Sequence, residues 1–567
     1  MPSFPLTTEP WIHVWDLDTD GGRDVGLAEA LTRAHRLRFA ALRSEDLPVL
    51  RVLAALYDAA CGPTTNTEWD AAWTAETLDT GAITAYLDQW GDRLDLFHSE
   101  HPAFQAAGLT DYNRGPASLH PGSLAGDAGA WFNPVLRTPD GVRPWEPADA
   151  ARYLLHLNAY DPAGIKGAAP GDPAARNNKV YGGQISPLAG VTHAHLRLPG
   201  NTIKELLLAN LPPQPRTPGD APVWERDSPG VSMRVRSATG RLDLLTWPAR
   251  RIRLHATDEG LVDAVAHYDG DRLADAWEDV ASLDPMTAWF TSRAGTPAPF
   301  QVLDIEGSSC PWRPAALLDA SASWGALQHL AAAAERGVLA QDLAVQAVMS
   351  SVVYSNRHRA TISDITLATM PICTTGQLAD PGARMTLAMM SRYTDAVAAD
   401  LRKHAIRISG RPSARVEHRT LFTDLERDWQ AAVDLSADDL EGARTQWHRA
   451  IAEAADSCID SLSLRPFQAE ELRVAYRARP DAAYRSSKSR ITTAPTPSAA
   501  GDKPRRRPGP ATERYDVFGG RYSLSEIAQR SDCAVSYKTL RDRVRDGWTV
   551  EKAATTPGRR GRPRDSA

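Results

Sequence analysis

The feature that most constrains the fold is a run of four long amphipathic segments in the second half of the chain. These segments are residues 383–408, 413–436, 439–463 and 468–484. Helix-stopping residues such as Gly410, Pro412 and Pro466 separate them. Amphipathic helices joined by short connections bury their apolar faces against one another. The pattern therefore predicts a four-helix bundle within residues 376–490.

Residues 1–375 have a different sequence pattern, in which short apolar runs alternate with frequent Pro and Gly. Such a pattern is typical of an irregular domain with many loops. Helical periodicity is clear at Leu47–Ala59 and Asn201–Leu211, and the alternation at Asp243–Leu254 favours one or two strands. We therefore expect an α+β protein with a large mixed N-terminal domain ahead of the bundle.

The chain beyond the bundle carries a linker and a much smaller domain. Residues 491–512 are rich in Ser, Thr, Pro and basic side chains, which cannot build a core, so we expect a flexible linker there. Residues 513–557 have the spacing of a small all-α helix-turn-helix module. Ser523 and Glu526 have capping-box spacing at the start of its first helix.

Two faces are predicted for the helix-turn-helix module. The residues expected to face inward are Leu524, Ile527, Ala528, Leu540 and Val544. The residues expected to contact DNA from the second helix are Tyr537, Lys538, Arg541 and Arg545. The alternative is a three-helix fold that docks on protein, since such small folds serve many functions.

The basic character of the C-terminal end contrasts with an acidic body. Residues 501–567 contain 16 Lys and Arg against 9 Asp and Glu, a net charge of +7, whereas residues 1–500 carry −13. A basic tail on an acidic body is typical of nucleic-acid binding, although a solvated tail is the alternative. The body must use local basic patches, or basic partner subunits, if it contacts a polyanion.

The last residues, 558–567, form a basic tail. Within this tail, Arg560, Gly561 and Arg562 resemble the AT-hook core, which lies along a narrow minor groove. The tail is therefore a second candidate for DNA contact near the C-terminus.

Several classes of protein are excluded by what the sequence lacks. No charge-free apolar run approaches the roughly 18 residues of a membrane-spanning helix, and Glu9 and His13 stand where a signal peptide would be apolar. The five cysteines form no CxxC pair. Motifs for zinc proteases, serine hydrolases and nucleotide binding do not occur in a credible setting. We expect a cytoplasmic protein that is not an enzyme and needs neither metal nor cofactor.

Short segments along the chain form an ordered set of landmarks. They include LTTEPWIHVW (6–15), HPAFQAAGL (101–109), AWFNP (130–134), YLLHLNAYDPAGIKGAAPGD (153–172), PVWERD (222–227), DPMTAW (284–289) and YSNRHRATISDI (354–365). In this order they resemble the type I-E CasA family, the large subunit of the Cascade surveillance complex of CRISPR antiviral defence. The resemblance covers roughly residues 1–490.

The resemblance implies a non-catalytic subunit of a ribonucleoprotein complex. Such a subunit reads the protospacer-adjacent motif (PAM) on duplex DNA, starts strand separation for R-loop formation, and helps recruit the effector nuclease. Guide pairing reads the remaining sequence, as in other guided systems. The implied partners are the guide RNA (crRNA), double-stranded target DNA, other Cascade subunits and the helicase-nuclease effector.

The resemblance also implies a PAM-contacting glycine loop at Gly164, Ile165, Lys166 and Gly167. A backbone without Cβ atoms can approach base edges closely, and a lysine can hold a phosphate. Ala163 stands where the family often has another glycine, and the alternative for the segment is an ordinary surface turn. A basic finger that reaches into the minor groove would be Arg272, although a single arginine in an acidic stretch is often a surface ion-pair partner.

Two further contacts are implied by the resemblance. A hairpin that parts the strands would use Arg357, His358 or Arg359 as its wedge, where the family favours glutamine; imidazole and guanidinium are both flat enough to stack. The alternative is a basic surface loop. Phe132, followed by Asn133, matches an aromatic residue that contacts the guide-RNA handle, where an exposed ring stacks on an unpaired base.

A competing hypothesis is an independent helix-turn-helix transcriptional regulator with a large sensing body. Such a regulator requires dimerisation on a palindromic site, and the chain contains no heptad pattern. Co-purification with a guide RNA distinguishes the two hypotheses.

Overall fold

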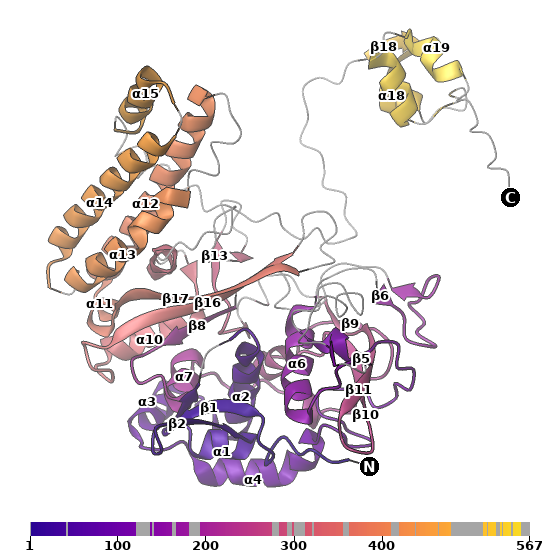
Figure 1. Cartoon of the computed structure of the whole chain (residues 1–567), viewed down its shortest axis with the longest axis vertical. Coiled ribbons are helices and arrows are strands. Elements are labelled where there is room, and N and C mark those ends of the chain that lie inside the picture. The colour runs from indigo at the N-terminus through magenta and orange to yellow at the C-terminus, as the bar shows by residue number, and fades with distance from the viewer. Residues whose placement is uncertain are drawn as a thin grey trace. The chain divides into compact units, whose positions relative to one another are not determined.

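The protein is described here by a computed structural model that divides into two units, Met1–Ala499 and Ala500–Ala567 (Figure 1). The residues that the structure describes are 2–40, 43–120, 137–138, 141–161, 166–180, 193–274, 280, 283–291, 297–299, 312–319, 322–354, 362–409, 419–436, 438–462, 464–477, 514–518, 520–528, 533, 535, 537–545 and 548–556.

Unit 1 mixes helices with several small sheets. Its helices before the bundle are α1 (Leu27–Thr32), α2 (Asp46–Cys61), α3 (Asn66–Thr74), α4 (Thr80–Trp90), α6 (Pro147–Tyr160), α7 (Ile203–Asn210), α8 (Arg241–Leu245), α10 (Gly325–Glu335) and α11 (Thr375–Ala379). It also has the short strands β4 (Arg137–Thr138), β5 (Gly141–Val142), β13 (Trp289–Thr291), β14 (Pro297–Pro299) and β15 (Ala322–Ser323). Among the described residues, no helix has the length and apolar character needed to cross a lipid bilayer.

A three-stranded antiparallel sheet opens unit 1. Its order is β2 (Gly21–Val25), β1 (Ile12–Asp16), β3 (Leu37–Phe39), with Ile12 opposite Val25 and Val14 opposite Phe39. Side chains of β1 alternate between buried and half-buried, as a strand with one face on the core requires.

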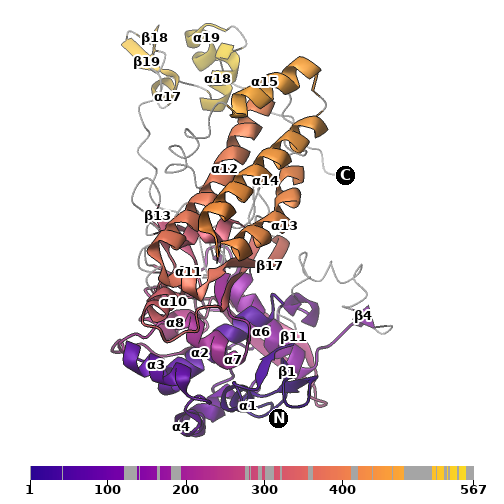
Figure 2. The same ribbon diagram turned by 90° about the vertical axis from the view of Figure 1, so that its left-hand side faces the viewer.

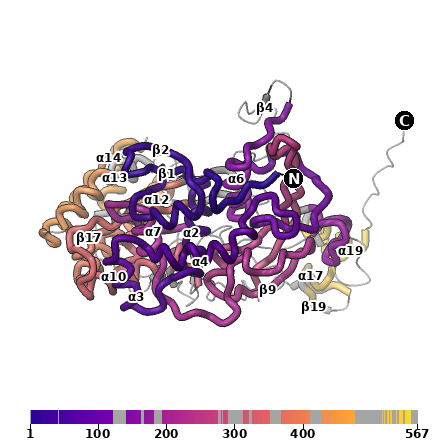
Figure 3. The backbone as a smooth tube through the Cα atoms, turned by 90° about the horizontal axis from the view of Figure 1, so that it is seen from below, coloured from indigo at the N-terminus to yellow at the C-terminus, as the bar shows by residue number. Residues whose placement is uncertain are grey.

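Helix α2 lies at the centre of the N-terminal core, where it packs against α4, α6, α7 and α8 (Figure 3). Its residues from Asp46 to Asp58 are all buried. A helix covered on every side must pair its charged groups. Arg51 donates to the Asp284 carboxylate over 3.0 Å, and Arg241 donates to Asp58 over 2.9 and 2.6 Å. The helix predicted at Leu47–Ala59 is thus confirmed, and its charges tie it to distant segments.

The longest strands are β16 (Ala344–Tyr354) and β17 (Ile362–Thr374), which pair as an antiparallel hairpin. Strand β8 (His193–Arg197) pairs with the other edge of β16. The two histidines of β8, His193 and His195, are buried, and their ring nitrogens have no hydrogen-bond partner within the described part of the chain. Burial and, to a lesser extent, the charge of Arg197 lower the pKa of His195 to about 3.

The segment Asp243–Leu254 differs from the sequence-based expectation of strands alone. It begins in helix α8 and continues into β10 (Arg250–Ala256) only after Trp247 and Pro248. The carboxylate of Asp220 accepts the backbone N–H groups of Leu242 and Asp243, which are among the unpaired donors of the first helical turn. This capping group is remote in sequence, so local alternation cannot reveal it.

Each of the four segments predicted for the bundle contains a helix. They are α12 (Pro381–Ser409), α13 (Arg419–Leu435), α14 (Leu440–Ser461) and α15 (Pro466–Arg477), and they run beside one another in Figure 2. Trp429 and Trp447 meet edge to face in the core, with ring centroids 5.0 Å apart. The indole of Trp447 donates to the Thr394 hydroxyl over 2.9 Å, which satisfies its buried N–H.

Unit 2 contains a β-hairpin as well as helices. Its elements are β18 (Arg514–Val517), β19 (Gly520–Ser523), α17 (Leu524–Ile527), α18 (Tyr537–Arg545) and α19 (Val550–Thr555). The expectation of an all-α module is therefore wrong. The hairpin forms because Val517 is buried in the small core while Tyr515 and Tyr522, opposite each other, pack beside it.

Candidate nucleic-acid interface

The end of the predicted glycine loop lies in a short hairpin of unit 1. Lys166 and Gly167 form β6 (Lys166–Gly167), which pairs antiparallel with β7 (Lys179–Val180). Gly167 is exposed, and a Cβ atom placed there would meet no atom within 4 Å. The fold itself therefore does not require glycine at this position. Gly164 and Ile165 lie outside the described residues, as does the side chain of Lys166.

A tight turn closes the chain between β6 and β7, and sequence analysis missed it. Arg176 and Lys179 exchange backbone hydrogen bonds of 2.8 and 3.1 Å across the turn. Asn177 and Asn178 have φ angles of 52° and 56°. Two consecutive residues with positive φ define a type I′ turn, for which asparagine is well suited. The signal was an Asn-Asn pair between polar residues, and all four turn residues are exposed.

The base of this loop is anchored to the body of unit 1. Asp172 is buried, and its carboxylate accepts the N–H of Ala174 over 2.8 Å and that of Met233 over 2.9 Å. Ala169 is buried in a small apolar cluster with Leu109 and Tyr268. One buried carboxylate and one apolar contact thus fix the loop against a segment 61 residues further along the chain.

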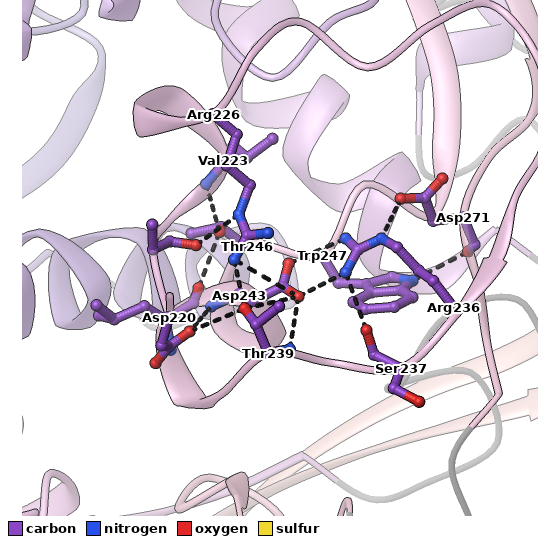
Figure 4. Close-up of polar contacts among 12 residues, drawn as sticks. Asp220, Val223, Arg226, Arg236, Ser237, Thr239, Asp243, Thr246, Trp247 and Asp271 are labelled. Carbon is purple, nitrogen blue, oxygen red and sulfur yellow. Dashed lines mark hydrogen bonds and ion pairs between the residues drawn. The ribbon is translucent and has the colours of Figure 1, made fainter. Parts of the chain in front are cut away.

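That segment is held in turn by the buried carboxylate of Asp271, which three arginines surround; Figure 4 shows Asp271 with one of them, Arg236. Asp271 accepts hydrogen bonds from Arg234 over 3.1 and 2.9 Å, from Arg236 over 2.5 Å, and from the fully buried Arg251. Burial would raise the pKa of Asp271, but these hydrogen bonds and the charge of Arg251 lower it. Asp271 therefore stays ionised as the centre of the cluster.

Arg236 connects this cluster to helix α8. Its guanidinium donates to the Asp243 carboxylate over 2.5 and 3.0 Å and lies 4.0 Å from the ring centroid of Trp247 (Figure 4). The indole of Trp247 donates to the backbone carbonyl of Asp271 over 3.0 Å. Strand β9 (Val235–Arg236) is thereby held parallel to β12 (Arg272–Leu273). These contacts hold the segment 233–236, to which Asp172 anchors the base of the β6–β7 hairpin.

Arg272, the expected basic finger, is buried with 6% of its surface exposed. Its guanidinium donates to the Asp269 carboxylate over 2.9 Å, and Asp269 also pairs with Arg250 over 3.1 Å. Burial and pairing give this side chain a structural role, which agrees with the ion-pair alternative except that the pair lies inside the protein. The expectation of an exposed contact at Arg272 has no support from this geometry.

The remaining predicted contacts of unit 1 and of the tail lie outside the described residues. They are Phe132, Asn133, Arg357, His358, Arg359, Arg560, Gly561 and Arg562. Strands β16 and β17 pair as far as Tyr354 and Ile362, so residues 355–361 connect two paired strands. The proximity of this connection to the glycine loop stays a prediction.

Unit 2 bears out the predicted inward face of its helices. Ile527 and Leu540 are buried, and Leu524, Ala528 and Val544 pack against the same cluster. Arg541 is exposed on α18. Tyr537, Lys538 and Arg545 lie on the same helix, but their side chains are outside the described part.

Solved structures with a similar fold identify the fold of this chain. The crystal structure of Cse1 from Thermobifida fusca is similar with a TM-score of 0.70 and 24% identity, covering 85% of this chain and 98% of that chain. A chain from a structure described as a CRISPR RNA-guided surveillance complex has a TM-score of 0.62 and 19% identity, covering 85% of this chain and 100% of that chain. The fold is thus the fold of CRISPR-associated Cse1 proteins.

Sequence comparison assigns the family. The profile of the family described as CRISPR-associated protein Cse1 (CRISPR_cse1) matches residues 5–478, and the chain belongs to this family. The CRISPR-associated protein CasA/Cse1 of Thermus thermophilus is 34% identical over 276 residues, which are 46% of this chain and 50% of the relative. The chain thus spans about half the length of this curated relative. The resemblance read from the sequence landmarks is confirmed, and the described residues of unit 2 lie beyond the family match.

Proposed function

We propose that the chain is the non-catalytic large subunit of a type I-E Cascade complex in the cytoplasm. Membership of the Cse1 family over residues 5–478 carries this proposal. The fold it shares with a chain of an RNA-guided surveillance complex supports it. In this role the chain binds the guide RNA and other Cascade subunits, recognises the PAM on double-stranded DNA, and helps recruit the helicase-nuclease.

The hairpin β6–β7 is the proposed PAM-reading element. Gly167 is exposed at a position where the fold would accept a side chain, so the absence of one leaves room for a groove to approach the backbone. The readout proposed here is through the minor groove, whose pattern is degenerate and suits a protein that tolerates several PAMs. The anchored loop base keeps this backbone in a fixed place, as a contact that positions DNA requires.

Strand separation is assigned to the connection between β16 and β17. We propose that Arg357, His358 or Arg359 replaces a stacking partner below the PAM while the basic groups favour the opened phosphates. Phe132 and Asn133 are the proposed contacts to the guide-RNA handle. Unit 2 is proposed to add a duplex contact through α18, and the tail after it is proposed to contact the minor groove.

The test of the subunit role is assembly. The full chain, co-expressed with candidate Cascade subunits and a guide RNA, is expected to co-purify with a ribonucleoprotein that binds a PAM-matched duplex. A chain that purifies free of RNA and binds one defined duplex by itself would support the regulator hypothesis instead.

The test of PAM reading is the variant Gly167→Val in the assembled complex. Valine fits an exposed strand position, so the fold is expected to be kept while the branched side chain obstructs the groove. We expect a loss of affinity for a PAM-matched duplex of about 10-fold or more, of the order of one lost specific contact, and little change for a target already unpaired at the PAM. Replacing Gly164 or Lys166 is expected to lower PAM discrimination as well.

The matched control is Gly22→Val, an exposed glycine in strand β2 whose nearest neighbours would lie 4.0 Å from an added Cβ atom. Equal affinities of the two glycine variants would exclude the hairpin as the PAM-reading element.

A further inference from the structure

The exposed turn Arg176–Lys179 places two cations side by side. Arg176 and Lys179 are bridged residues of an antiparallel pair, so their Cβ atoms are about 5 Å apart. Like charges in this arrangement destabilise a hairpin. Neither side chain forms an ion pair with any residue that the structure describes. The arrangement costs free energy in the isolated chain, and an anion at the turn would offset that cost.

Several other arginines near the surface of unit 1 do pair with carboxylates. Arg33, Arg336 and Arg473 each have a carboxylate partner, in keeping with the net charge of −13 over residues 1–500. Other exposed cations, such as Arg114 and Arg216, have no carboxylate partner among the described residues either, so the lack of a counter-charge alone does not set Arg176 and Lys179 apart. What distinguishes these two cations is that they face each other across one turn. Two such cations on one turn form a local basic patch of the kind the body needs in order to approach a polyanion.

The turn is also rigid, which a positioning contact requires. The type I′ geometry at Asn177 and Asn178 sets the direction of the two flanking side chains. The buried Asp172 fixes the loop that carries them. A duplex presents its phosphates in a fixed row, so two cations at fixed spacing can hold them without first losing backbone freedom.

The turn is contiguous with the glycine segment. In the ladder between β6 and β7, Gly167 lies opposite Lys179 and Lys166 opposite Val180. Directly opposed residues in such a pair have Cα atoms about 4.5 to 5.5 Å apart. Any duplex that reaches Gly167 therefore brings its backbone within range of Lys179. Figure 1 places β6 at the margin of unit 1.

We infer that Arg176 and Lys179 form a phosphate-binding clamp for the duplex that carries the PAM. The inference rests on the proposed function, because it takes duplex DNA as the ligand of the neighbouring glycine segment. The clamp holds the sugar-phosphate backbone and positions the duplex, and it reads no bases. The asparagines between the cations set their geometry.

The experiment measures duplex affinity against salt for the complex assembled with the full chain. The double variant Arg176→Ala with Lys179→Ala removes two phosphate contacts. Each contact contributes about 0.9 to the slope of log affinity against log salt, so we expect the slope to fall by about 1.8 and the affinity at about 0.1 M salt to fall about 60-fold. The ratio of affinities for matched and mismatched PAMs is expected to stay unchanged.

Two controls separate the clamp from general effects. The charge-preserving double variant Arg176→Lys with Lys179→Arg is expected to keep most of the slope. Arg216→Ala removes an exposed cation from another loop of the acidic body and is expected to leave the slope unaltered. An unchanged slope in the alanine double variant would overturn the inference. Loss of guide RNA from that variant would also overturn it, because the turn would then be an RNA contact.

Failure of the proposed function gives a different result. In that case the wild-type chain does not assemble with guide RNA. The same salt titration of duplex affinity, done on the full chain alone, then tests whether Arg176 and Lys179 contact phosphates. A slope difference of about 1.8 between wild-type chain and double variant would still support the clamp, whereas equal slopes would refute it.

Discussion

Replacing Asp271 by asparagine tests the cluster that carries the hairpin. Asparagine keeps the shape of the side chain but removes the charge that faces Arg234, Arg236 and Arg251. Breaking a buried ion pair by removing one partner costs about 3 to 5 kcal/mol. Arg251 keeps backbone acceptors at Gly230, Pro248 and Ser232, so we expect the lower end, about 3 kcal/mol.

The assay is urea denaturation of the full chain, followed by tryptophan fluorescence. With an m-value of about 3 kcal/mol/M, the expected loss moves the midpoint for unit 1 down by about 1 M. Hydrogen exchange should also quicken at residues 166–180, because Met233 belongs to the segment that anchors Asp172.

The matched control is Asp263→Asn, which breaks an exposed pair with His255. Such pairs contribute at most about 1 kcal/mol, so its midpoint should hardly move. If Asp271→Asn lowered the free energy of unfolding no more than Asp263→Asn does, the claim that the Asp271 cluster stabilises the segment anchoring the hairpin would be refuted.

Three further predictions concern acid stability, the turn and the C-terminal unit. His195 is neutral when folded, with a pKa of about 3, and titrates near 6.5 when unfolded. The contribution of neutral His195 to the free energy of unfolding is therefore complete above about pH 6.5 and is lost as the pH falls from 6.5 towards 3, by about 2 kcal/mol between pH 7 and pH 5. In thermal melts at both pH values, His195→Leu should remove this part of the loss of stability in acid. Asn177→Val puts a branched side chain at a φ of 52° and should cost about 1 to 3 kcal/mol and weaken duplex binding, whereas Asn178→Gly should preserve both. Deleting residues 501–567 should leave assembly with guide RNA intact but weaken duplex binding and flatten its salt dependence, and an unchanged slope would contradict phosphate contacts by this unit.

Much of the helical structure was predictable because its signals are local. The periodicity at Leu47–Ala59 and in the four segments after residue 380 identified helices that the structure contains. The inward residues of unit 2, such as Ile527 and Leu540, followed from the same spacing. The hairpin of β18 and β19 was missed, since its short alternation around Val517 lies directly ahead of a helix signal.

The candidate interface was predictable only in part. The order of the landmarks identified the family and pointed to Lys166 and Gly167, which the structure places in β6. It did not identify the turn at Arg176–Lys179, whose signal is one Asn-Asn pair. Arg272 was predicted to be exposed, and it is buried instead against Asp269.

By itself the sequence determined the long helices with clear periodicity, the inward residues of the helices in unit 2, and the family to which the chain belongs, because periodicity and motif order are properties of neighbouring residues. Only the tertiary structure decided which arginines are structural and which face solvent. Arg251 and Arg176 are the same type of residue. Arg251 is buried and pairs with the carboxylate of Asp271, 20 positions away, while Arg176 lies on an exposed turn with no described counter-charge. Burial of a charge depends on partners that folding brings together from distant parts of the chain, and spacing along the sequence does not record them.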